Sequence, residues 1–224
     1  MQLSLVRPIA CLRRLARDAR AVAVMEFALA LPPVMAIGGY GIELSNLALA
    51  NLRVSQYALN LADEASRVGL DSGLPTIQLR EVDVNDVLQG ARLSGAQMQL
   101  TTYGRVTLSS LEGQSDGTQL LHWQRCIGVK SGSGYDSSYG TASTSSGSTV
   151  SGMGDAPAVT APAGAGVMFV EVNYDYQPLF GTLFVPAKKL HYTASFIVRD
   201  RRDFSQIYNP SPAATATSCD RHNA

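Results

Sequence analysis

The sequence has 224 residues, of which 46% are hydrophobic and 16% are charged, and its formal net charge is +0. This balance excludes a strongly basic chain of the kind that binds nucleic acid, so we expect no nucleic-acid partner. The chain beyond residue 69 is long enough for one modest domain with its own hydrophobic core.

The chain begins with a basic segment, residues 1–21, followed by an apolar run. Between Val22 and Ile42 the only charged side chain is Glu26. About 20 apolar residues, at about 1.5 Å each, cover the roughly 30 Å hydrocarbon core of a membrane. Several arginines precede the run, whereas residues 43–51 contain no Lys or Arg. Because cationic flanks stay in the cytoplasm, we expect one membrane span with its N-terminus inside and the rest of the chain outside.

A secretory signal peptide is the competing interpretation of this N-terminus, because it also has a basic start and an apolar stretch. Its apolar region would be shorter and would end at a small-x-small cleavage site. Here the run continues past Pro32 and Pro33 through Ile37 to Leu44 and Leu49. This length favours a span that is either uncleaved or specially cleaved.

Three residues inside the span need an explanation. Glu26 is costly in hydrocarbon, so it either reaches up to the headgroups or has a function. Pro32 and Pro33 each remove a helical hydrogen bond, and they predict either a kinked, locally melted helix or a simple bend.

The helical pattern continues after the span. Apolar residues from Leu44 to Val68 recur at spacings of three to four, with polar residues between them. We therefore predict one helix over 22–69, half in lipid and half packed on an outer domain. Gly69 is a plausible stop for it.

Residues 70–205 are predicted to form an extracytoplasmic α+β domain. A second helix is expected from Val82 to Leu93, with Asp83 or Asn85 near its N-terminus. The expected strands are Gln97–Thr102, Gly104–Ser110, Gln119–Val129, Val167–Tyr176, Gly181–Val185 and Lys189–Arg199. Polar and apolar residues alternate in the Val167 strand, which suggests one buried face. A long N-terminal helix laid on a small antiparallel sheet is thus the predicted fold.

Two segments beyond residue 69, one inside this domain and one after it, are predominantly polar. Residues 130–166 are rich in Ser, Gly and Thr, so we expect a mobile, exposed loop. The alternative is a binding loop that a partner orders through Tyr135 and Tyr139. Residues 206–224 form a polar C-terminal tail.

The three cysteines divide by compartment. Cys11 lies in the basic leader, where thiols stay reduced, whereas Cys126 and Cys219 are predicted to lie outside. We hypothesise a disulfide between Cys126 and Cys219; the alternative is two free thiols. Such a bond would tie the polar tail to the domain.

No enzyme motif is present in the sequence. It contains no phosphate-binding loop, and His122, His191 and His222 have no paired metal-ligand spacing. Trp123 is expected to be a core residue, and the charged residues 199–203 a solvated cluster at a strand end. We therefore expect no catalytic residue, no metal and no cofactor.

The run from Arg20 to Pro32, with its Glu26-Phe27 pair, resembles the N-terminal segment of the TadE/TadG family. These proteins are pseudopilins of bacterial tight-adherence (Tad, Flp-type) pilus systems. The resemblance implies cleavage between Ala21 and Val22, which makes Glu26 and Phe27 the fifth and sixth mature residues. Ala21 stands where the family favours Gly.

The resemblance also implies a function and partners. A prepilin peptidase would recognise Ala21, Val22, Glu26 and Phe27, and the Glu26 carboxylate would pair with the new amino group on Val22 of a neighbouring subunit. The chain would have a pilin-like architecture in the bacterial inner membrane and would interact with other pilins and the pilus assembly platform.

Two alternatives belong to other functional classes. The first is a permanently anchored envelope scaffold or surface-binding protein that keeps residues 1–21. The second is a hydrolase-like or lectin-like outer domain. The N-terminus of the membrane-extracted protein distinguishes the first from a processed pseudopilin.

Overall fold

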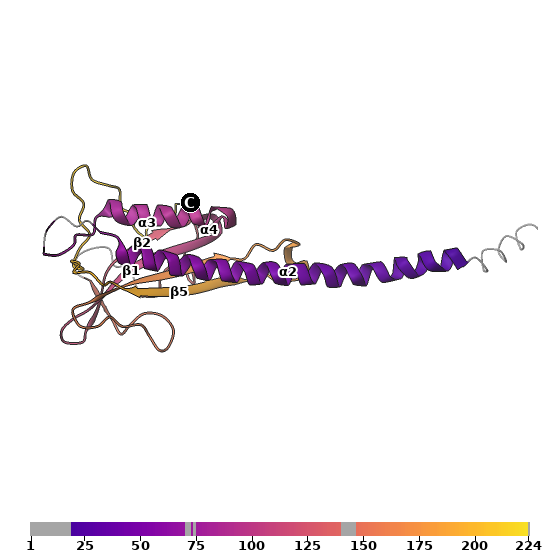
Figure 1. The fold of residues 1–224 in the computed structure, drawn as a ribbon, viewed down its shortest axis with the longest axis horizontal. Coiled ribbons are helices and arrows are strands. Elements are labelled where there is room, and N and C mark those ends of the chain that lie inside the picture. The colour runs from indigo at the N-terminus through magenta and orange to yellow at the C-terminus, as the bar shows by residue number, and fades with distance from the viewer. Residues whose placement is uncertain (1–18, 70–72, 74, 140–146, 224) are drawn as a thin grey trace, which may run out of the picture. The chain divides into compact units, whose positions relative to one another are not determined.

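A computed structural model describes residues 19–69, 73, 75–139 and 147–223 (Figure 1). The described chain forms two compact units. The first comprises the residues up to Asn46 together with Pro178–Pro186, and the second comprises 47–177 and 187–224. The predicted α+β class, a long apolar N-terminal helix followed by a small antiparallel sheet, is confirmed. Residues 1–18 of the predicted leader, including Cys11, lie outside the described residues.

Helix α2 spans Ala19–Arg67, a range close to the predicted 22–69. It continues as α-helix through Pro32 and Pro33, so the structure contains no locally melted turn there. Each proline still removes one helical N–H, which leaves the carbonyls of Ala28 and Leu29 without their usual donor.

Five antiparallel strands form one sheet in the order β3-β2-β1-β4-β5. Their bounds are β1 Gly104–Gly113, β2 Gln119–Ile127, β3 Ser148–Val150, β4 Gly166–Asp175 and β5 Lys189–Ile197. Four of these agree with predicted strands, whereas β3 was not predicted. The predicted strand Gln97–Thr102 is wrong, because the chain forms η1 (Ala96–Met98) and α4 (Leu100–Tyr103) there. Gln99 has a left-handed backbone with φ of 50°, which turns the chain between them.

Both faces of β4 are buried, which corrects the prediction of a single buried face. The register places Val170 and Val172 beside Leu108 and Val106 of β1 on one face, and the polar Glu171 on the other. Glu171 is nevertheless buried, with 4% of its surface exposed. The reason is that the segment after β2 covers this second face.

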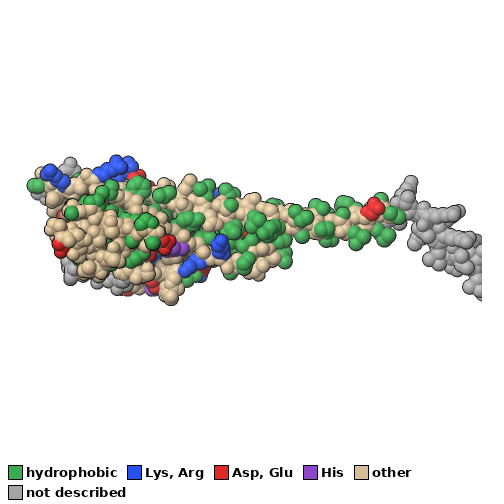
Figure 2. Space-filling model, turned by 90° about the horizontal axis from the view of Figure 1, so that it is seen from below, with side chains coloured by type: hydrophobic (Ala, Val, Ile, Leu, Met, Phe, Trp, Pro, Cys, Tyr) green, Lys and Arg blue, Asp and Glu red, His purple; other side chains and the backbone are tan. Residues whose placement is uncertain are grey.

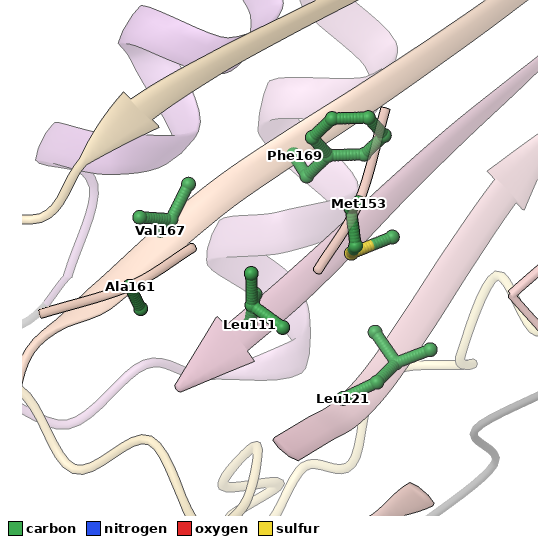
Figure 3. Packing of buried hydrophobic residues seen from close by; sticks show 6 residues of the cluster. All are labelled: Leu111, Leu121, Met153, Ala161, Val167 and Phe169. Carbon is green, nitrogen blue, oxygen red and sulfur yellow. The ribbon is translucent and has the colours of Figure 1, made fainter. Parts of the chain in front are cut away.

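Many described residues of the Ser/Gly-rich segment 130–166 are exposed, but a few of its apolar side chains pack against the sheet. Figure 3 shows the cluster of buried side chains that it completes, consisting of Leu111, Leu121, Val167 and Phe169 from the strands with Met153 and Ala161 from the segment. Met153 is fully buried, and Tyr139 contacts the Phe169 ring edge-on at 6.0 Å. The prediction of an exposed loop is therefore wrong for Tyr139, Met153 and Ala161. Residues 140–146 lie outside the described residues.

Within the second unit, two helices run along the sheet (Figure 1). Helix α3 spans Glu81–Ser94, one residue more at each end than predicted, and the Asp83 carboxylate accepts the Arg80 N–H at 3.1 Å. Helices α2 and α3 lie side by side in this unit. The Glu64 carboxylate of α2 is 3.6 Å from the position that a Cβ on Gly90 of α3 would take. The buried hydrophobic residues of α2 in this unit are Ala50, Val54, Ala58, Leu61, Ala62 and Ala65.

Arg202 corrects the prediction of a solvated charge cluster at 199–203. Its side chain is fully buried and donates to the carbonyls of Ala65 (2.9 Å) and Ser66 (3.1 Å) in the last turn of α2. These carbonyls have no helical donor, and a cation favours the negative end of a helix. Arg202 therefore caps α2.

The C-terminal tail is joined to the second face of the sheet by covalent and polar bonds. Cys126 and Cys219 form a disulfide, in agreement with the hypothesis from sequence. The fully buried Arg105 donates to the carbonyls of Cys219 and, at 2.9 Å, Arg221. The N–H of Gly128 donates to the Asn223 carbonyl at 2.8 Å. The tail is thus a structural part of the domain.

Candidate functional site

The candidate site is the apolar N-terminal part of α2 with the segment Pro178–Pro186, both in the first unit. Within the described residues, α2 from Val22 is the one helix long and apolar enough to cross a membrane. No residue of its most apolar stretch is buried. Figure 2 shows hydrophobic side chains along the length of this part of the helix.

The residues that the resemblance singled out lie on this exposed helix. Val22, Glu26 and Phe27 are all exposed, and Phe27 has 66% of its surface accessible. Ala21 is part of α2, but its side chain lies outside the described residues. Val22 and Glu26 are four residues apart, so they share one face of the helix.

A second acid, Glu43, was missed by the sequence analysis. It is fully buried, and its two carboxylate oxygens accept the backbone N–H groups of Leu179 (3.3 Å) and Phe180 (3.0 Å). The partners lie 136 and 137 positions away in the sequence. The only sequence signal for this site was an acidic residue directly after the apolar run that ends at Ile42. The sequence did not indicate which groups this residue would bind.

The segment Pro178–Pro186 packs on α2 through aromatic rings. The Phe184 ring contacts Tyr40 at 6.4 Å and Phe180 at 5.6 Å, both edge-on. A Cβ built on Gly39 would lie 2.9 Å from the Phe184 ring, so any larger side chain at this position would displace the ring from the helix.

The predicted strand Gly181–Val185 is wrong. Residues Gly181–Leu183 form the short 3₁₀ helix η2, and Gly181 has a left-handed backbone with φ of 61°. That conformation favours glycine and takes the chain out of an extended path.

A groove of about 720 Å³ lies between α2 and this segment, inside the first unit. Its helical wall is formed by residues between Val34 and Ile42, and its other wall by Phe180, Leu183 and Phe184. None of the described residues that line it is charged. Such walls suit an apolar occupant.

The polar side chains of the second unit form contacts within the folded domain. His122 pairs with Glu112, and His191 contacts the Asn173 side chain at 2.7 Å. Burial raises the pKa of Glu171, although a hydrogen bond from the Ser137 side chain opposes this shift. Trp123 is a buried core residue, as predicted.

The described parts of the chain contain no cluster of candidate metal ligands. In residues 19–69, 73, 75–139 and 147–223, no three His, Cys, Asp or Glu side chains come together as metal ligands. His222, the remaining histidine, lies 3.0 Å from a guanidinium nitrogen of Arg105. The exposed apolar helix and its groove are therefore the features that a function must explain.

Comparisons of the chain with protein-family models, with curated proteins and with solved structures found no match.

Proposed function

We propose that this chain is a membrane-anchored pseudopilin-like subunit of a Tad-type pilus system. It acts through helix-mediated subunit interactions and carries out no chemistry of its own. The observation that carries the proposal is the exposed apolar part of α2, which bears an acid, Glu26, and continues into a helix packed on an antiparallel sheet. The Glu26-Phe27 pair and the basic leader add the resemblance to the TadE/TadG family.

Glu26 is the residue on which assembly depends in this proposal. After cleavage before Val22, the chain would begin with a positively charged amino group on the same helix face as the Glu26 carboxylate. Both charges are costly in an apolar surrounding, and each would be neutralised by its counterpart on an adjacent subunit. Correct subunit register would then bring the two charges together.

Processing and location follow from the same proposal. A prepilin peptidase would recognise Ala21, Val22, Glu26 and Phe27 and remove residues 1–21. The subunit would lie in the bacterial inner membrane with its α+β domain outside, where it would meet other pilins and the assembly platform. The Cys126–Cys219 disulfide is compatible with an oxidising compartment.

The second candidate is a permanently anchored envelope scaffold or surface-binding protein. Ala21 favours it, because the small residue before the proposed cut is not the preferred glycine. In that case residues 1–21 would stay on the chain as a cytoplasmic segment, and the apolar part of α2 would be the permanent anchor.

The Glu26→Ala variant tests the assembly role. We expect it to insert into the membrane as the parent does, but to enter pili or pilus-assembly complexes at least about 100-fold less. Removing one partner of a buried ion pair costs about 3–5 kcal/mol. The measurement is quantitative immunoblotting of membranes and of sheared pili from cells in which the variant replaces the parent.

The matched control is Glu64→Ala, which removes an exposed carboxylate from the same helix outside the apolar part. It should assemble like the parent. Normal assembly of the Glu26→Ala variant would show that the pairing role is wrong.

A further inference from the structure

We propose that Pro178–Pro186 is a second membrane-embedded element, which inserts among lipid acyl chains beside the helical span. The inference rests on the proposed membrane span of α2 and goes beyond it, because it assigns lipid as the occupant of the groove between α2 and this segment. The segment is called the apolar loop below.

The composition and exposure of the apolar loop fit hydrocarbon. Its sequence, Pro-Leu-Phe-Gly-Thr-Leu-Phe-Val-Pro, contains no charged residue. Leu183 has 76% of its surface exposed, Leu179 has 61% and Phe180 has 45%. Three large exposed apolar side chains within five residues mark an interaction surface. In water each of them would be costly to leave uncovered.

Glu43 bonds two of the backbone groups that a loop must satisfy at membrane depth. Irregular backbone is tolerated in hydrocarbon only where its N–H and C=O groups are bonded within the protein. The buried Glu43 carboxylate accepts the N–H groups of Leu179 and Phe180, the two residues that lead into η2. Facing water, these N–H groups would find solvent acceptors without a dedicated side chain. The bonds therefore point to a site without water.

The position of the loop along α2 places it at the outer edge of the span. From Val22 to Ile42 a helix rises about 30 Å, close to the thickness of a hydrocarbon core. Glu43, which holds the loop, is the next residue. Tyr40, which contacts Phe184, is an aromatic residue of the type enriched at membrane boundaries. The loop thus lies at the depth of the outer leaflet.

The groove continues the lipid-facing surface of the span. Val34 and Met35 line it, and both also belong to the exposed apolar part of the helix. Phe180 and Leu183 form the opposite wall. An acyl chain that lies along the span would pass into this groove without meeting a charged group. Lys188 follows the loop in the sequence and suits the phosphates of headgroups.

The test measures the depth of position 183 in the full-length protein, reconstituted into vesicles of phosphatidylcholine and phosphatidylglycerol. Leu183→Cys is made in a Cys11→Ser background and labelled with the fluorophore NBD, since the disulfide cysteines do not react. Leu29→Cys, in the proposed span, and Leu93→Cys, an exposed leucine of α3, are the matched controls. Quenching by brominated acyl chains is compared with quenching by aqueous iodide.

We expect bromolipid to quench positions 183 and 29 to a similar extent and iodide to quench position 93 alone. Quenching of position 183 by iodide, with position 29 still quenched by bromolipid, would overturn the loop proposal and leave the span intact. Protection of position 183 from both quenchers would overturn it in favour of a protein partner. If bromolipid fails at position 29, the proposed span itself is wrong.

A second variant tests the part assigned to Glu43. We expect Glu43→Ala to lower bromolipid quenching at position 183 at least about twofold and to leave position 29 unchanged, since the freed N–H groups favour water. Glu64→Ala should change neither. Unchanged quenching at position 183 in Glu43→Ala would show that Glu43 does not hold the apolar loop in the membrane.

Discussion

Replacing both Cys126 and Cys219 by serine is expected to lower the free energy of unfolding by about 4 to 5 kcal/mol. The disulfide joins residues 93 positions apart, and in the chain-entropy model the stabilisation grows with the loop that is closed. The tail would also lose the covalent bond that holds it beside Arg105, whose guanidinium donates to the carbonyls of Cys219 and Arg221.

Trp123 provides the measurement for this prediction, because it is the one tryptophan in the sequence and is buried. Its fluorescence is followed during urea unfolding of the full-length protein in detergent micelles. Cys11→Ser is the control and should unfold like the parent. A parent protein whose mobility on a non-reducing gel is unaffected by reductant would contradict the disulfide.

Glu81→Ala is expected to destabilise the domain by about 3–5 kcal/mol, because it leaves a buried arginine without its counter-ion. The Arg125 Nε lies 2.9 Å and 3.1 Å from the two Glu81 carboxylate oxygens, and both residues are buried. The pair joins the start of α3 to β2. Urea unfolding monitored by Trp123 fluorescence measures the loss.

Two control variants separate the ion pair from other causes. Asp63→Ala breaks the largely exposed Asp63–Arg67 pair and should cost less than about 1 kcal/mol. The double variant Glu81→Leu, Arg125→Met removes both charges and should recover most of the loss, since apolar replacements of a buried pair are often neutral. If Glu81→Ala costs no more than Asp63→Ala, the pair does not link α3 to the sheet.

The long helix, most strands and the disulfide could be predicted because their signals are local or compositional. The apolar run and the three-to-four spacing from Leu44 onward predict α2 within a few residues. Alternation in β4 predicts its extent. Cys126 and Cys219 were the two cysteines assigned to the outside, which left one pairing there.

The covered second face of the sheet could not be predicted. Its cover depends on single apolar residues in a polar background, above all Met153 and Tyr139. Ser/Gly-rich composition normally cannot offset ordering entropy, and no periodicity marks these two residues as buried. Their partners, Leu121 and Phe169, come from separate strands. The surface on which Met153 and Tyr139 pack therefore exists only after the sheet has formed.

The apolar loop was also misjudged for a physical reason. A short apolar run between prolines fits a buried strand as well as it fits an irregular, exposed loop. The left-handed Gly181 and the distant acceptor Glu43 decide between them, and neither is visible in the local pattern. The same limit applies to Arg202, whose acceptors at Ala65 and Ser66 are more than 130 positions away.

The central proposal is that this chain is a processed pseudopilin-like subunit whose mature helix begins at Val22. Intact-mass measurement of the full-length gene product, extracted from the membranes of cells that contain the prepilin peptidase, tests it most directly. The account predicts a mass that lacks residues 1–21 and an N-terminal sequence beginning Val22-Ala23-Val24. A mass that retains Met1–Ala21 would contradict it and favour the permanently anchored protein.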